Sequence, residues 1–322
     1  MNKSTTIFGI DISKDTFDVW NQVLGHKKFS NDLKGFKEFK KWLSDSPWCV
    51  MEYTGSYYQQ LAMFLYKNGI SLSVVNPLVI KRFIQMKFQH NKTDKSDSRL
   101  IALYGTEQRL KPWEPNPDYI EQCKALHTTI ALYFKQSTAL KNKVHSFESR
   151  GTSRVIVQSL KRQLKQLRDE IKRLEAEIEL LIKENEPDML SNLLSIPGIG
   201  KKTAMMLISS SNAFRSFENH KQLSAFYGLS PSEHTSGISV KGKSRITKKG
   251  NPYIRNHLFM CSFTASEHNQ ACKALYTRIA NKGKSKKLAL IAVCNKLLKQ
   301  SFAIATSGVP YNQEYRSRLQ MQ

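Results

Sequence analysis

The strongest constraint on the fold of this chain is a run of eight apolar residues at alternating spacings of three and four. These residues are Val157, Leu160, Leu164, Leu167, Ile171, Leu174, Ile178 and Leu181. The spacing is that of a heptad repeat, and most of the flanking residues are charged. We therefore predict a long helix whose apolar seam forms a coiled coil, within a hairpin or between protomers. The alternative is an amphipathic helix packed on its own domain.

The seam separates two parts of the 322-residue chain that differ in sequence pattern. Strand-like and helix-like segments alternate before it, which favours an α/β layer fold, and the sequence after it is almost wholly helical in pattern. Three prolines in KPWEPNPD end the first pattern. We predict an α/β catalytic domain (1–112), a helical linker and coiled coil (113–186), an all-α basic domain (187–308) and a polar tail (309–322).

The charge balance points to a polyanionic partner. The chain has 50 Lys and Arg against 26 Asp and Glu, and from Pro187 onward the counts are 20 and 5. Such an excess favours nucleic acid, and it places the contact mainly in the C-terminal half. Neither a run of about 18 apolar residues nor an apolar leader is present, so we expect a cytoplasmic protein with no membrane partner.

Five cysteines are scattered along the chain without the spacing of metal ligands. We predict that they are reduced thiols in the protein core. The residues are Cys49, Cys123, Cys261, Cys272 and Cys294.

Acidic residues interrupt apolar segments of the first domain. Asp11 ends the apolar run IFGID, and Glu52 follows the buried-strand pattern of CVM. Asp94 and Asp97 lie three apart at the start of a helical pattern, so they share a helix face. Asp11 alone could cap a turn, and acids at a helix start are stabilised by its dipole. Together, four carboxylates suit one or two hard divalent cations, as in two-metal phosphodiester chemistry.

The segment LLSIPGIGKKTAMMLIS resembles a helix-hairpin-helix motif. The backbone amides of its Pro-Gly-Ile-Gly turn, with Lys201 and Lys202 after it, suit a nucleic-acid phosphate. The alternative is an ordinary connection between two helices with solvated lysines.

A basic, glycine-rich segment follows, with Ser236 at its centre. In HTSGISVKGKSRITKKG the serine precedes a glycine and lies among cations that could stabilise a phosphoryl transition state and an alkoxide. Residue chemistry alone leaves open whether Thr235 and Ser236 only donate hydrogen bonds to phosphate. The predicted nucleic-acid contacts here and in the preceding turn are Lys201, Lys202, Lys241, Lys243, Arg245, Lys248, Lys249 and Arg255.

Taken in order, several segments resemble the DEDD transposases of bacterial insertion sequences. The matching segments are FGIDISKDTFDVW, VMEYTGSYY, NKTDKSDSRLIALYG, LLSIPGIGKKTA and GLSPSEHTSGISVKGKSRITKKGNPYIRNHL. The resemblance is to insertion-sequence family one hundred and ten and its sister group, the bridge-RNA-guided recombinases. It implies a ribonuclease-H-like N-terminal domain, similar to Holliday-junction resolvases, with a Mg²⁺-binding tetrad. The matching residues are Asp11, Glu52, Asp94 and Asp97.

The resemblance also implies a nucleophile and an RNA partner. The family's serine falls on Ser236, which would form a covalent link to DNA. The residue before it here is Thr235, where related segments often have Ser or Gln, so Thr235 and Ser244 stay open as alternatives. A structured guide RNA would pair with donor and target DNA while the protein grips the backbone.

Our hypothesis from the sequence is an RNA-guided DNA transposase or recombinase that combines a Mg²⁺-dependent DEDD site with a serine nucleophile. We expect a dimer or tetramer assembled through residues 157–182, with the tetrad and the serine meeting between protomers. The first alternative is a metal-only, structure-selective nuclease whose C-terminal domain binds DNA. The second is a nucleic-acid-binding scaffold with structural carboxylates.

Overall fold

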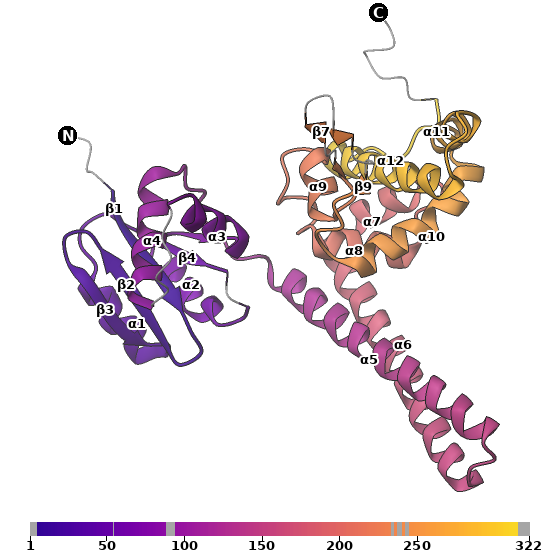
Figure 1. Cartoon of the computed structure of the whole chain (residues 1–322), viewed down its shortest axis with the longest axis horizontal. Helices are drawn as coiled ribbons and strands as arrows, with labels where there is room; N and C mark the ends of the chain where they lie inside the picture. The colour runs from indigo at the N-terminus through magenta and orange to yellow at the C-terminus, as the bar shows by residue number, and fades with distance from the viewer. Residues whose placement is uncertain are drawn as a thin grey trace, which may run out of the picture. The chain divides into compact units, whose positions relative to one another are not determined.

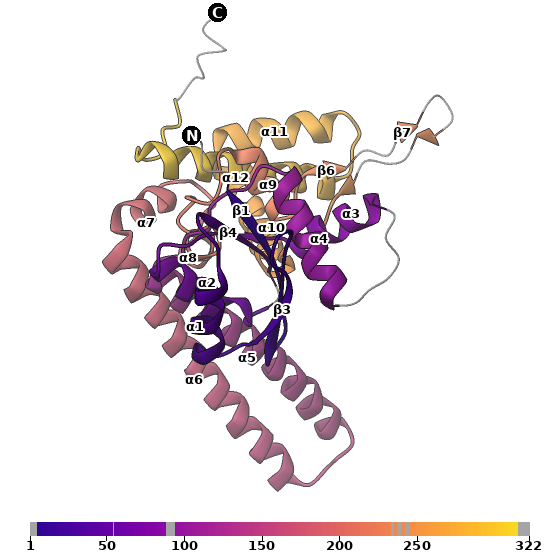
Figure 2. The same ribbon diagram turned by 90° about the vertical axis from the view of Figure 1, so that its left-hand side faces the viewer.

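A computed structural model describes residues 5–53, 55–87, 94–232, 235–236, 240–241 and 245–314. For residues 94–95, 235–236 and 240–241 the description covers the backbone but not the side chains. The chain divides into two units, Met1–Pro115 and Asn116–Gln322 (Figures 1 and 2). The division falls within the proline-rich segment that ends the strand-and-helix pattern.

The first unit contains a five-stranded mixed sheet in the order β3-β2-β1-β4-β5. Antiparallel pairs join β1 (Thr6–Ile12), β2 (Thr16–Asn21) and β3 (Gly25–Ser30). Parallel pairs join β1 to β4 (Pro47–Glu52) and β4 to β5 (Ser71–Val75). The central strand β1 therefore has one antiparallel and one parallel neighbour.

Helices cover both faces of this sheet. Side chains of α1 (Leu33–Trp42) and α2 (Tyr58–Lys67) form one apolar core against the strands. A smaller core on the other face includes side chains of α3 (Pro77–Met86) and α4 (Asp94–Glu107). The resulting layers confirm the predicted α/β class and fit a ribonuclease-H-like domain.

A long helical hairpin opens the second unit. Helix α5 (Asp118–Ser149) and helix α6 (Arg154–Asn185) run antiparallel and pack along their length (Figure 1). On α5 the buried side chains are Ile120 and then, every seven residues, Cys123, Ile130, Ser137 and Val144. On α6 they are Val157, Leu164, Ile171, Leu174, Ile178 and Ile182.

The apolar seam is therefore covered within the chain. Its partner is α5 of the same chain, and the protomer contact through residues 157–182 stays a prediction. The seam also ends on Ile182, which is fully buried, rather than on the half-buried Leu181.

The described residues of the second unit also include six further helices. They are α7 (Pro187–Leu194), α8 (Lys201–Ser210), α9 (His220–Phe226), α10 (Pro252–His268), α11 (Gln270–Asn281) and α12 (Lys286–Ser307). Helix α12 is long and apolar enough to cross a membrane by length and composition. Its side chains Val293, Leu297 and Leu298 are fully buried in the core of this unit, and α12 packs against α7, α9, α10 and α11. We therefore interpret α12 as a core helix.

All five cysteines are free thiols, and Cys261 is half-buried while the other four are buried. Burial raises the pKa of Cys123 to about 11 and the pKa values of Cys272 and Cys294 to about 12. The four buried cysteines agree with the prediction of reduced core thiols, whereas Cys261 lies at the edge of the core.

Candidate active site

Two of the predicted acidic residues lie at the ends of neighbouring strands. The parallel pairing of β1 and β4 places Ile10 beside Met51. Asp11 and Glu52 are the next residues of the two strands, so the same offset brings them level with each other. Paired residues of neighbouring strands point to the same face of a sheet. Ile10 and Met51 point into the core beneath α1 and α2, so Asp11 and Glu52 point toward the α3–α4 face. Both acidic residues are half-buried.

Helix α4 packs directly on that face, across glycines. A Cβ atom at Gly9 would lie 2.2 Å from the backbone nitrogen of Ala102 and 2.2 Å from the backbone oxygen of Ser98. A Cβ atom at Gly105 would lie 2.8 Å from a methyl carbon of Ile7. Only glycine allows so close an approach of helix and strand. The contacts also show that α4 runs opposite to β1.

The direction of α4 brings its N-terminal turn toward Asp11. Two strand residues span about 6.6 Å, which corresponds to about four helix residues at 1.5 Å each. Since Ser98 lies over Gly9, the turn that contains Asp94 and Asp97 lies at the level of Asp11. The fold thus brings three separate segments with all four predicted acids to one end of the sheet.

The described side chains do not form a cluster of metal ligands. Asp97 is half-buried, and its carboxylate accepts a hydrogen bond from the Ser96 hydroxyl at 3.4 Å. The side chain of Asp94 lies outside the described residues. Among the described side chains, no three His, Cys, Asp or Glu groups are close enough together to hold a metal ion. The chemistry of the donor set nevertheless fits a hard cation, because all four groups offer carboxylate oxygens.

A fifth acid, Asp18, was missed by the sequence analysis. Asp18 pairs with Asp11 across β1 and β2, and it is only 6% exposed. The His26 Nε2 atom lies 2.7 Å from one Asp18 carboxylate oxygen, and the Lys28 Nζ atom lies 3.4 Å from the other. A buried carboxylate needs such partners. The sequence contained one sign of this residue, an acid within the strand pattern TFDVW. The partners of Asp18 could not be predicted, because they come from another strand, β3.

The Pro-Gly-Ile-Gly turn joins α7 to α8 and packs against α10. Gly198 has φ +102°, and a Cβ atom there would lie 2.6 Å from the Cβ atom of Ala265. The Lys201 ammonium lies 2.5 Å from Glu179 of α6, and the Lys202 ammonium lies 2.8 Å from Glu175. Both lysines are about half exposed, so these ion pairs are weak. The phosphate-binding role of this turn stays a prediction.

The basic segment folds into two short ribbons. Strand β6 (Pro231–Ser232) pairs with β9 (Arg245–Ile246), and β7 (Thr235–Ser236) pairs with β8 (Val240–Lys241). Ser236 is opposite Val240. The side chains of Thr235, Ser236 and Lys241, and all of Lys243 and Ser244, lie outside the described residues.

The base of the ribbons is tightly anchored. A Cβ atom at Gly228 would lie 2.1 Å from the Lys249 carbonyl oxygen, and Gly250 has φ +114°. Arg255 donates hydrogen bonds to the carbonyl oxygens of Tyr227 at 3.2 Å and Gly250 at 3.0 Å. Arg255 thus holds the base of the ribbons, and its contact with nucleic acid stays a prediction. Three other predicted contacts are exposed at this end of the segment, namely Arg245, Lys248 and Lys249.

Acidic strand ends on a mixed sheet, followed by a separate basic helical unit, fit a DNA transposase or recombinase. Comparison with known proteins agrees with this class. Residues 8–147 match the model of a transposase family, the DEDD transposases of IS110. Residues 190–277 match "Transposase IS116/IS110/IS902 family".

Individual relatives extend over almost the whole chain. The pilin gene-inverting protein of Moraxella bovis is 31% identical, with 96% of this chain and 98% of the relative covered. The transposase for insertion sequence element IS1111A of Coxiella burnetii is 26% identical, with 96% and 88% covered. This chain belongs to the IS110 family of DEDD transposases and recombinases. It is thus a DNA transposase or recombinase, of a family that uses divalent metal ions.

Proposed function

We propose that this protein is an RNA-guided DNA transposase of an insertion sequence that cuts and rejoins DNA through a covalent serine–DNA intermediate. The proposal is supported chiefly by the strand register and the packing of α4, which direct Asp11, Glu52 and the first turn of α4 toward the same end of the sheet. Family membership supplies the substrate class, DNA.

The four acids would hold Mg²⁺ through carboxylate oxygens. They are Asp11, Glu52, Asp94 and Asp97. A bound Mg²⁺ ion supplies Lewis-acid stabilisation of the negative charge on the scissile phosphate. Asp18 would act indirectly, because its hydrogen bond with His26 and its ion pair with Lys28 offset a charge that would otherwise repel Asp11.

Ser236 would be the nucleophile. Its hydroxyl oxygen would form a bond to phosphorus while one P–O bond of the DNA backbone breaks, and the serine proton would pass through solvent to the leaving oxygen. The number of phosphodiester bonds is conserved, so rejoining needs no external energy source. The exposed cations Arg245, Lys248 and Lys249 would stabilise the phosphate charge during both steps.

A guide RNA would choose the sites. The basic unit offers charge for gripping a backbone, and base pairing between a structured RNA and both DNA partners would supply sequence choice. We further propose cytoplasmic action as a dimer or tetramer, so that the tetrad of one protomer can serve the serine of another. Because α5 covers the buried residues of the α6 seam, protomers that associate through residues 157–182 would do so through the exposed side of the hairpin.

Covalent trapping tests this proposal. We expect wild-type protein with Mg²⁺, guide RNA and labelled DNA to give an adduct that survives denaturation, whereas Ser236→Ala gives none. Thr235→Ala and Ser244→Ala are the matched controls and should keep the adduct. Asp11→Asn should abolish cleavage but leave RNA binding intact.

Two outcomes would count against it. Cleavage without any adduct, unchanged in Ser236→Ala, would favour the metal-only nuclease. An adduct that disappears only in Thr235→Ala or Ser244→Ala would move the nucleophile. Sequencing the RNA that copurifies with the protein, and comparing it with the DNA flanking the gene, tests the guide.

A further inference from the structure

Charge is strongly polarised along the α5–α6 hairpin. Residues 135–168, which form its distal half, contain nine Lys and Arg but one acid, Glu148. Residues 169–186 of the proximal half contain seven acids and three Lys and Arg. Cations gathered at this density repel one another, so the distal half is best stabilised by a polyanion.

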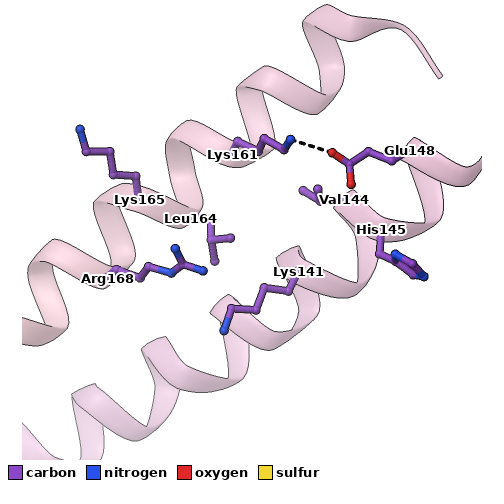
Figure 3. A pocket seen from close by; sticks show the side chains of 8 residues that line it. All are labelled: Lys141, Val144, His145, Glu148, Lys161, Leu164, Lys165 and Arg168. Atoms are coloured by element: carbon purple, nitrogen blue, oxygen red, sulfur yellow. Dashed lines mark ion pairs between the residues drawn. The ribbon is translucent and has the colours of Figure 1, made fainter. Parts of the chain in front are cut away.

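A groove between the two helices lies at the centre of the distal half. It has a volume of about 390 Å³ and is floored by the buried seam residues Val144 and Leu164. Cationic side chains come from both helices (Figure 3). Those used in the argument are Lys141 from α5 and Lys161, Lys165 and Arg168 from α6.

Most of this charge has no internal partner. The Lys161 ammonium lies 2.6 Å from the Glu148 carboxylate, which is the one acid lining the groove. Lys141, Lys165 and Arg168 are exposed and form no ion pair with any residue in the part of the chain that the structure describes. These three cations are therefore available to an external anion.

The dimensions suit a nucleic-acid backbone rather than a small anion. From Lys161 to Arg168 the helix rises about 10 Å. A DNA duplex presents about six phosphates over that length, counting both strands. The remaining cations of residues 135–168 extend the charged surface beyond the groove. A single phosphate would neutralise only a small part of it.

We infer that residues 135–168 form a DNA-binding arm, which grips the backbone of double-stranded DNA through Lys141, Lys165 and Arg168. The inference rests on the proposed function for the identity of its partner. It adds a contact surface outside both the acidic sheet end and the basic ribbons. Backbone contacts of this kind position DNA without reading its sequence.

The test compares two charge-matched triple variants of the full-length protein. The arm variant is Lys141→Gln, Lys165→Gln and Arg168→Gln. The control variant, Lys172→Gln, Arg173→Gln and Lys183→Gln, removes the same charge from the proximal half. Fluorescence anisotropy with a labelled duplex of arbitrary sequence, at increasing KCl and without divalent metal, measures binding while cleavage is prevented.

We expect the arm variant to bind duplex DNA at least about ten-fold more weakly. The slope of log affinity against log salt should become shallower by about three, since each lost phosphate contact changes it by about one. The control variant should keep the wild-type slope. Equal slopes in both variants would overturn the inference, as would a loss of affinity for structured RNA but not for DNA.

A gain of affinity supplies an independent measurement that misfolding cannot imitate. Glu148→Gln removes the one acid of the groove and frees Lys161, so we expect several-fold tighter duplex binding. Glu177→Gln, on the acidic proximal half, is the control and should change affinity less. No gain in Glu148→Gln would contradict the arm.

The arm and the proposed function fail separately. If the arm variant binds duplex DNA more weakly as expected but no serine adduct forms, the proposed chemistry is refuted and the DNA-binding arm is supported. If the serine adduct forms but the arm variant binds like wild type, the DNA-binding arm is refuted and the proposed chemistry is supported.

Discussion

Gly9 of β1 lies against Ala102 of α4 so closely that a Cβ atom at position 9 would be 2.2 Å from the Ala102 backbone nitrogen. This contact sets the position of α4 along β1, the strand that carries Asp11 next to its last residue. It therefore links a packing detail to the position of the acidic site.

Replacing that glycine should damage both stability and activity. We expect Gly9→Ala to lower the free energy of unfolding by about 3 kcal/mol or more, because the methyl group meets backbone that cannot move aside. It should also displace the first turn of α4 and reduce Mg²⁺-dependent cleavage. Gly200→Ala is the control, since a Cβ atom there meets nothing within 4 Å. Equal melting temperatures for the two variants would refute the close packing.

Asp18 should matter for the integrity of the sheet. Asp18→Asn keeps the size of the side chain but removes the charge that faces His26 and Lys28. We expect a loss of about 1–3 kcal/mol in the free energy of unfolding by urea, since buried charged hydrogen bonds are lost. Asp45→Asn, at an exposed position, should leave stability within about 0.5 kcal/mol of wild type.

A substitution at Arg255 tests whether this residue stabilises the fold or contacts DNA. Arg255→Lys keeps the charge but not the guanidinium geometry that reaches the Tyr227 and Gly250 carbonyls. We expect about 1–2 kcal/mol lower stability, measured by thermal unfolding, with little change in the salt dependence of DNA binding. Unchanged stability with weakened DNA binding would instead favour the predicted contact of Arg255 with nucleic acid.

The seam should behave as an intramolecular core. Ile178→Ala removes a fully buried side chain from the hairpin, and we expect a loss of about 2–5 kcal/mol. Because α5 of the same chain covers Ile178, the loss should not depend on protein concentration. A midpoint that rises with concentration would show that the seam joins protomers after all.

His127 gives the second unit a pH dependence. Its ring lies 2.9 Å from the Ser209 hydroxyl, and burial together with His257 lowers the pKa of His127 from 6.5 to about 4. Since the folded state resists protonation of His127, its contribution to stability is present above pH 6.5 and is lost as the pH falls toward 4. His127→Gln should reduce the change in melting temperature between pH 6.5 and pH 4. His145→Gln, at an exposed position, should leave that change as in the wild type.

Sequence patterns determined several features of this protein. The alternation of strands and helices predicted the α/β layers, and the heptad spacing predicted the long helix that became α6. The resemblance of dispersed segments indicated the transposase family, because residues such as Asp11 and Glu52 keep their order along the chain. These features are local in the sequence or follow its order, so they need no knowledge of contacts.

Only the tertiary structure decided which groups meet. The heptads gave α6 an apolar face, but any complementary face could cover it, and the fold supplied α5. The partners of Asp18 come from another strand, and those of Lys201 and Lys202 from another helix. Periodicity specifies which side of a helix or strand is buried. The choice of the packing partner depends on chain reversals and on close approaches such as that of Gly9 to Ala102. These contacts arise only when distant segments of the chain pack together.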